Sequence, residues 1–103
     1  MNLDQNQWWE NAQKEEDAIF LDVRTPEEVE RGIIPNAINM DIYKGQGFIY
    51  LLEELDKSKP YYVYCHAGIR SAKACEIMQE MGFKATYNLV GGMSAWNGPV
   101  VEP

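Results

Sequence analysis

The chain has 103 residues, of which 46% are hydrophobic and 12% aromatic, so it can bury a core and is not a disordered segment. Sixteen acidic and nine basic residues give a formal net charge of −7, which argues against a nucleic-acid partner. No stretch approaches the roughly 20 apolar residues of a membrane-spanning helix, so no membrane partner is expected. We expect one domain over residues 1–103 and, by default, a monomer.

The N-terminal residues have neither the basic start nor the apolar stretch of a secretory signal, which favours a cytoplasmic location. Thiols stay reduced in that compartment, so Cys65 and Cys75 are expected to be free. The two cysteines are ten residues apart and the chain has one histidine, which does not amount to a zinc ligand set. No metal site is expected.

The first half of the chain alternates helix and strand signals. Residues 4–15 fit a helix capped by the aspartate at its start, and residues 18–23 form an apolar run of strand length. Residues 25–32 begin with a threonine cap, a proline and two acidic residues and end at a glycine, which predicts a short helix. Residues 36–40 are typical of a second short strand.

The same alternation continues in the second half. Residues 47–55 carry apolar side chains on one helical face, and residues 61–65 are rich in aromatic and β-branched residues, as in a strand. Residues 70–83 predict a helix, and residues 86–90 predict a fourth strand. Residues 91–98 predict a glycine-bounded turn followed by one or two helical turns.

Strands that alternate with helices predict an α/β fold, with a mainly parallel sheet and helices on both of its faces. The predicted strands are nearly all apolar, as in a sheet that is covered on both sides. Ligands of such sheets bind outside the carboxyl ends of the strands. Cys65 closes the strand predicted at 61–65 and therefore lies where this architecture places its chemistry.

The segment from Cys65 to Arg70 offers several positive features to an anion. Consecutive backbone N–H groups between a strand and a helix can form a concave nest, and the helix start adds unpaired donors. Gly68 permits an unusual backbone conformation, and Arg70 is a fixed cation. Such surroundings lower the pKa of a thiol, so the sequence predicts that Cys65 is a reactive thiolate rather than an inert buried cysteine.

Two charged residues lie at the end of the strand predicted at 18–23, at the same edge of the sheet. The carboxylate of Asp22 is expected to accept N–H groups and to brace the active loop. Arg24 is expected to pair with Glu28, about one helical turn further on. We expect structural rather than catalytic roles for Asp22 and Arg24.

His66 and Cys75 each allow two interpretations. His66 could stabilise the thiolate or assist proton transfer, or it could be an exposed side chain whose backbone N–H group matters. Cys75 falls with Ala74 and Met78 on an apolar helical stripe, so we expect it in the core. Most of three helical turns separate it from Cys65, so a disulfide between them is not expected.

The tryptophans and the last glycine-rich turn also give expectations. Trp8, Trp9 and Trp96 are expected to pack helices onto the sheet, with one of the adjacent pair exposed. Glycines at 91–92 are expected to let the last loop approach the active site closely. Met93 and Trp96 are then candidates for the rim of that site.

Three segments resemble, in order, the signature blocks of rhodanese-like single-domain sulfurtransferases. They are "LDVRTPEEVERGIIPNAINM", "YYVYCHAGIRSAKA" and "NLVGGMSAW", and the stretch from the first to the last covers about 80 of the 103 residues. The resemblance implies a sheet of about five strands, with helices on both faces. The four strands predicted above and a short one near the N-terminus would supply that sheet.

The resemblance also implies a persulfide mechanism without an organic cofactor. Cys65 would take a sulfane sulfur from a small-molecule donor such as thiosulfate or a persulfide, and would pass it to a thiol or cyanide-type acceptor. A protein donor or acceptor is equally open. Asp22, Arg24 and Ser71 would support the site, and the loop that cradles the persulfide would consist of His66, Ala67, Gly68, Ile69 and Arg70.

Two other functions remain open. Related phosphatases and arsenate reductases have one residue more between cysteine and arginine, whereas four residues separate Cys65 from Arg70 here. A tighter ring of donors suits a sulfur atom better than a tetrahedral phosphate, so the spacing favours sulfur transfer. A sulfur-carrier or regulatory module that docks to one partner would use the same loop.

Overall fold

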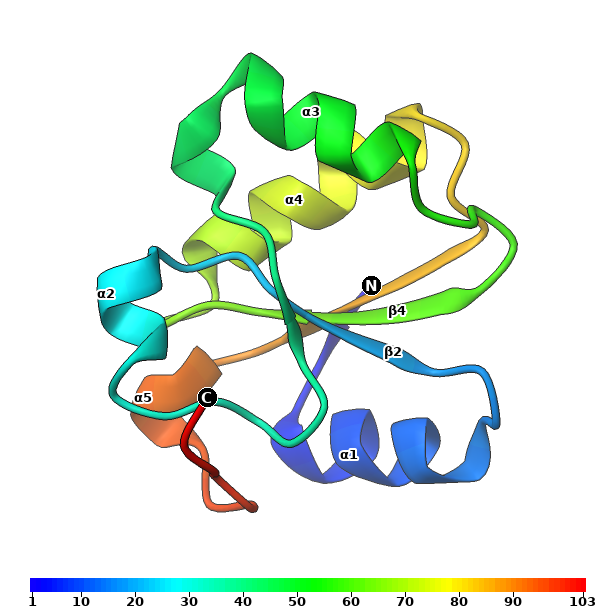
Figure 1. The fold of residues 1–103 in the computed structure, drawn as a ribbon. Coiled ribbons are helices and arrows are strands. Elements are labelled where there is room, and N and C mark those ends of the chain that lie inside the picture. Colours follow the sequence, from blue (N-terminus) through cyan, green and yellow to red (C-terminus); the bar gives the residue numbers. More distant parts are fainter.

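A parallel β-sheet lies between two layers of helices in the computed structural model, which describes residues 1–103 (Figure 1). Its elements in chain order are β1 (Asn2–Leu3), α1 (Gln5–Lys14), β2 (Ile19–Asp22), α2 (Pro26–Val29), β3 (Ile38–Asn39), the 3-10 helix η1 (Ile42–Lys44), α3 (Gln46–Glu53), β4 (Pro60–Tyr64), α4 (Ile69–Glu80), β5 (Ala85–Leu89) and α5 (Gly92–Ala95).

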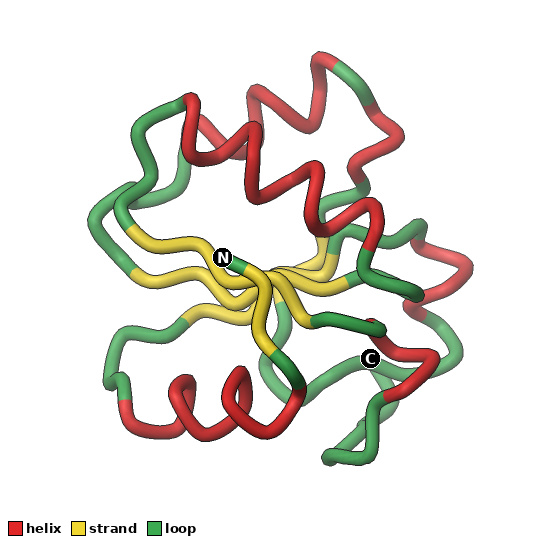
Figure 2. The backbone as a smooth tube through the Cα atoms, turned by 180° about the vertical axis from the view of Figure 1, so that it is seen from behind, coloured by secondary structure: helices red, strands yellow, loops and turns green.

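The sheet has five strands in the order β1-β5-β4-β2-β3, and every pairing between them is parallel. This confirms the predicted α/β fold, including the short strand near the N-terminus. Viewed from behind, the sheet separates one helical layer from the other (Figure 2). The carboxyl ends of β2 and β4 point to the side where α2, α5 and the start of α4 gather, on the left of Figure 1.

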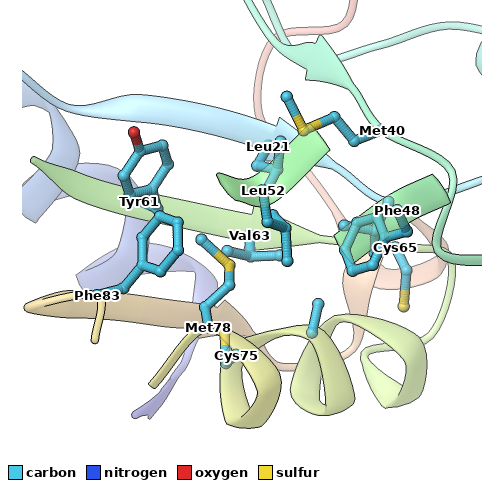
Figure 3. Packing of buried hydrophobic residues seen from close by; sticks show 12 residues of the cluster. Leu21, Met40, Phe48, Leu52, Tyr61, Val63, Cys65, Cys75, Met78 and Phe83 are labelled. Carbon is cyan, nitrogen blue, oxygen red and sulfur yellow. The ribbon is translucent and has the colours of Figure 1, made fainter. Parts of the chain in front are cut away.

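The central strand β4 divides its side chains between two hydrophobic clusters, because successive residues of a strand face opposite sides. Tyr62 and Tyr64 face α1 and α5, whereas Tyr61, Val63 and Cys65 face α3 and α4. Figure 3 shows Cys65 at one end of the cluster on the α3–α4 side, beside Phe48. The clusters are Leu21, Val23, Met40, Phe48, Leu52, Tyr61, Val63, Cys65, Ala74, Cys75, Met78 and Phe83 on the α3–α4 side, and Trp8, Ala12, Ile34, Tyr62, Tyr64 and Leu89 on the other.

The tryptophans pack on the α1 side of the sheet, as predicted. Trp8 is fully buried and its ring meets that of Trp96 edge to face. Trp9 is half-buried and stacks on Phe20, so neither member of the adjacent pair is fully exposed. No helix is long and apolar enough to cross a membrane.

Several predicted boundaries were wrong. The helix expected over 25–32 covers only Pro26–Val29, although its threonine cap forms as predicted, and the strand expected over 36–40 covers only Ile38–Asn39. The 3-10 turn η1 was not predicted. Two further boundary differences lie at the site. Strand β4 ends at Tyr64, one residue before the cysteine, and helix α4 begins at Ile69, one residue before the predicted start.

Candidate active site

Cys65 is the first residue after β4, at the carboxyl edge of the sheet. The strand is fixed there because the amide of Val23 on the β2 side donates to the carbonyl of Tyr64 at 3.1 Å. The cysteine is 1% exposed and its side chain closes the α3–α4 cluster. Its own carbonyl accepts the amide of Met93 at 2.9 Å. The thiol is therefore held by the sheet and by a segment close to the C-terminus.

Three donors converge on the sulfur of Cys65. The amide of Gly68 lies 3.1 Å from Sγ, and the amide and hydroxyl of Ser71 lie 3.4 Å and 3.3 Å from it. Burial alone would raise the pKa of the thiol, but the hydrogen bonds from Ser71, Gly68 and Ala67 outweigh it and hold the pKa of Cys65 below its ordinary value. The arrangement favours the thiolate, which is the nucleophilic form.

A left-handed glycine turns the chain from the loop into α4. Gly68 is the N-cap of this helix and has φ +94°, a conformation that side chains rarely adopt. A Cβ atom at this position would lie 3.2 Å from the amide of Gly91 and from the carbonyl of Leu89. The first turn of α4 then directs the amide of Ser71 at the sulfur. Ile69 and Arg70 thus belong to this helical turn rather than to the loop.

The start of α5 supports the loop from behind. The amides of Met93 and Ser94 donate to the carbonyls of Cys65 and His66 at 2.9 Å and 2.8 Å. Gly92 makes this approach possible, because a Cβ atom there would lie 2.5 Å from both carbonyl oxygens. The predicted close approach is therefore confirmed.

Met93 and Trp96, both predicted for the rim of the site, lie in different places. Met93 lines a pocket together with His66. Trp96 does not lie beside the loop, because its ring packs against Trp8 and Trp9 and lines a different hollow on the α1 side. The expectation for Trp96 was wrong.

Arg70 is engaged by an acidic partner that the sequence did not suggest. Its guanidinium donates to both carboxylate oxygens of Glu28, at 2.7 Å and 2.8 Å, and lies over the ring of Tyr43. The hydrogen bonds from Arg70, more than any other contact, lower the pKa of Glu28 to about 2. Arg70, predicted as a fixed cation of the cradle, is thus half of a bidentate ion pair.

Asp22 and Arg24 pair with each other instead of with the partners predicted for them. Asp22 accepts Nε and a terminal nitrogen of Arg24, the latter at 2.7 Å. Arg24 reaches only the backbone carbonyl of Glu28, at 3.4 Å, and donates to the carbonyl of Gly32 at 2.7 Å. Neither side chain bonds to residues 65–71. Through these carbonyls Arg24 braces the turn around α2. It does not pair with the carboxylate of Glu28, which is bonded to Arg70.

The remaining loop side chains face outward. His66 and Ala67 are exposed, and Ile69 is 79% exposed although it lies in the first turn of α4. His66 makes no side-chain hydrogen bond, which fits the interpretation in which its backbone matters. Ser71, in contrast, is fully buried beside the sulfur.

Asn88 of β5 is a site residue that the sequence reasoning missed. Its amide nitrogen donates to the carbonyl of Gly68 at 3.1 Å and to the side chain of Asn2 at 2.9 Å. Its oxygen is a second acceptor for the hydroxyl of Ser71, whose single proton is shared between Asn88 and the sulfur of Cys65. The signal was present, because a lone amide inside an apolar strand must find buried partners. Asn88 thereby holds in place Gly68 and Ser71, the two residues that donate to Cys65.

Cys75 lies in the core, as predicted. It is 4% exposed, and burial raises the pKa of its thiol to about 11. Both cysteines are free. The structure brings together no three His, Cys, Asp or Glu side chains that could hold a metal ion.

A pocket of about 320 Å³ borders the loop on the α2 side. The loop contributes His66 to its wall, and α2 contributes Glu28. The complete lining is Arg24, Glu28, Arg31, Gly32, His66, Met93 and Val100. A small molecule in this pocket would lie against Glu28 and His66.

Comparison with known proteins connects this geometry to a family. Residues 5–99 match the family described as Rhodanese-like domain. YtwF of Bacillus subtilis (strain 168) is 40% identical over 92 residues, which cover 86% of this chain and 82% of that protein. Thiosulfate sulfurtransferase GlpE of Coxiella burnetii (strain RSA 331 / Henzerling II) is 38% identical over 88 residues, covering 85% of this chain and 78% of that one.

The fold comparison agrees. A crystal structure of a rhodanese-like domain protein from Staphylococcus aureus matches 99% of this chain and 97% of its own, with a TM-score of 0.84 and 28% identity. The resemblance found in the sequence is thereby confirmed. The chain belongs to the rhodanese-like domain family, and it is an enzyme of the sulfurtransferase type.

Proposed function

We propose that the protein transfers a sulfane sulfur through a persulfide on Cys65. The observation that carries this proposal is the convergence of the Gly68 amide and the Ser71 amide and hydroxyl on one sulfur atom. These donors favour the thiolate before the reaction. They also suit the negative charge of a persulfide after it.

In the loading step the thiolate of Cys65 attacks the sulfane sulfur of a donor. A new S–S bond forms, the bond between the sulfane sulfur and the rest of the donor breaks, and its electron pair leaves with the donor fragment, as sulfite when the donor is thiosulfate. In the transfer step an acceptor thiolate attacks the outer sulfur of the persulfide. This step forms an acceptor persulfide and returns the thiolate of Cys65.

The cradle is proposed to act through its backbone. The loop residues His66 and Ala67 are exposed and Gly68 is buried, so the cradle presents amides rather than side chains to the sulfur. Ser71 supplies the one side-chain donor at the sulfur. Asp22 and Arg24 hold the neighbouring turn and have no proposed chemical step.

The test of this proposal is a measurement of intact mass after incubation with thiosulfate. The wild-type protein is expected to gain one sulfur atom, which a thiol acceptor then removes. Cys65→Ser is expected to gain none, because an alcohol at this position cannot carry the persulfide. Cys75→Ser is the matched control and is expected to load like the wild type. Sulfur gained by Cys65→Ser would overturn the assignment of the carrier.

A measurement of the acceptor step distinguishes an enzyme that acts on small molecules from a sulfur carrier. A loaded protein that passes sulfur repeatedly to cyanide and to small thiols acts as an enzyme on small molecules. A loaded protein that turns over only with a partner protein would be a sulfur carrier. Hydrolysis of an aryl phosphate that depends on Cys65, without any sulfur gain, would replace the proposal with a phosphatase function.

A further inference from the structure

We propose that Glu28 makes the site select sulfane-sulfur donors that carry one negative charge over donors that carry two. The inference rests on the proposed sulfur transfer at Cys65 and deepens it, because it names a charge class of donor. Glu28 is then a specificity-determining residue that touches neither the thiol nor the transferred sulfur.

The first step of the argument concerns the charge of Arg70. A guanidinium near an anion-binding loop would attract a dianion more strongly than a monoanion. Here both terminal nitrogens of Arg70 bond to Glu28, and Tyr43 covers one face of the guanidinium. The pKa of Glu28, about 2, keeps the carboxylate ionised at neutral pH. The pair therefore offers an approaching anion little net positive charge.

The second step concerns the pocket that borders the loop. Glu28 and the loop residue His66 both lie in its wall, so a donor that enters this pocket lies against both residues. Arg24, also in the wall, is neutralised by Asp22 at 2.7 Å. Arg31 is the one arginine of this pocket without an ion-pair partner. One uncompensated cation matches a donor with one negative charge.

The third step concerns the apolar side chains around the loop. Met93 lines the pocket, and Ala67 and Ile69 are exposed and border a second hollow beside Gly68. These side chains offer no donor to a second charged oxygen. They can contact a methyl or methylene group in its place. The surroundings of the loop thus suit a donor in which an alkyl group replaces one charge.

Thiosulfate and methanethiosulfonate form a matched pair of probes for this difference. Both contain the same sulfane sulfur, but a methyl group replaces one charged oxygen, so their charges are 2− and 1−. With either donor the thiolate of Cys65 attacks the sulfane sulfur and the S–S bond of the donor breaks. The electron pair leaves with sulfite in one case and with methanesulfinate in the other, and the Cys65 persulfide is the same product.

The experiment compares how fast each donor loads Cys65 in Glu28→Gln and in wild type. Glutamine keeps the capping box of α2, since Glu and Gln both serve at that position, so the variant is expected to fold. Coulomb energy scales with the charge of the donor. If the loss of Glu28 raises the second-order loading rate of thiosulfate about tenfold, that of methanethiosulfonate should rise only about threefold.

Glu27→Gln is the matched control. It removes the same charge from the same helical turn, but Glu27 is exposed and has no ion-pair partner. Its loading rates are expected to stay within about twofold of wild type for both donors, because exposed charges are screened. The effect of Glu28→Gln is also expected to shrink as ionic strength rises.

The outcomes are distinguishable. Equal changes for both donors in Glu28→Gln, or the same donor ratio in Glu27→Gln as in Glu28→Gln, would overturn the role of Glu28 while leaving sulfur transfer intact. Absence of a Cys65 persulfide with either donor in the wild type would overturn the proposed function itself. Thermal unfolding of each variant shows whether a lower loading rate results from a loss of folded protein.

Discussion

At the scale of single residues, the two thiols differ through their surroundings alone. Hydrogen bonds from Ser71, Gly68 and Ala67 hold the pKa of Cys65 below its ordinary value against the effect of burial, whereas burial raises the pKa of Cys75 to about 11. A thiol with a lowered pKa ionises earlier as pH rises, and one with a raised pKa ionises later. At neutral pH the two cysteines should therefore differ in reactivity, although both are buried.

This difference predicts selective alkylation. Iodoacetamide is expected to modify Cys65 with a pH midpoint below that of a free thiol, and to leave Cys75 unmodified up to about pH 9 in the folded protein. Ser71→Ala should move the Cys65 midpoint upward, because the thiolate loses a donor. Peptide mapping after alkylation measures both sites. In denaturant the two cysteines should titrate alike, and a persistent difference there would contradict the explanation.

At the scale of elements, the start of α5 decides the position of the loop. Gly92 has φ +54° and no room for a Cβ atom beside the carbonyls of Cys65 and His66. Gly82, after α4, also has a positive φ, +98°, but open space around it. Substitution of Gly82 therefore tests backbone strain alone, whereas substitution of Gly92 tests strain together with displacement of the loop.

Alanine at either glycine is expected to cost about 1–2 kcal/mol of unfolding free energy from the left-handed backbone, and at Gly92 the contact with two carbonyl oxygens adds to this cost. Only Gly92→Ala should also displace the loop and slow persulfide loading, by about a hundredfold for a shift near 1 Å. Urea unfolding gives the first quantity, and the loading rate at a fixed thiosulfate concentration gives the second. Equal loading by the two variants would show that α5 does not position the loop.

At the scale of the whole molecule, the sheet joins two clusters that must unfold together. All three tryptophans belong to the α1 side, so tryptophan fluorescence reports that side. Met78 is fully buried on the opposite side, in the cluster that contains Cys65. A change at Met78 therefore tests whether one face of the sheet depends on the other.

Met78→Ala is expected to lower the unfolding free energy by about 2–5 kcal/mol through the cavity it leaves. Because β4 contributes to both clusters, fluorescence and far-UV circular dichroism should report the same shifted midpoint in urea. Glu76→Ala, on an exposed position of the same helix, should leave the midpoint nearly unchanged. Separate midpoints for the two probes would mean that the layers unfold independently.

Much of the architecture followed from local patterns. The order of helices and strands, the cap at Thr25 and the turn at Gly68 depend on neighbouring residues, so they can be inferred without a structure. The location of Cys65 at the carboxyl edge followed from the alternation of elements. The predicted boundaries were less accurate, because tertiary packing decides how many residues of an apolar run join the sheet. The strand expected over 36–40, for example, forms only at Ile38–Asn39.

The partners inside the site were decided by the tertiary structure. Glu28 and Arg70 are 42 residues apart, and they meet because α2 and α4 both begin at the carboxyl edges of the adjacent strands β2 and β4. The same cause brings Asn88 to Ser71 and α5 to the loop. The sequence by itself predicted which cysteine would meet hydrogen-bond donors, since Gly68 and Ser71 follow it closely in the chain. Only the folded chain decided that Arg70 is neutralised, since its partner comes from another element.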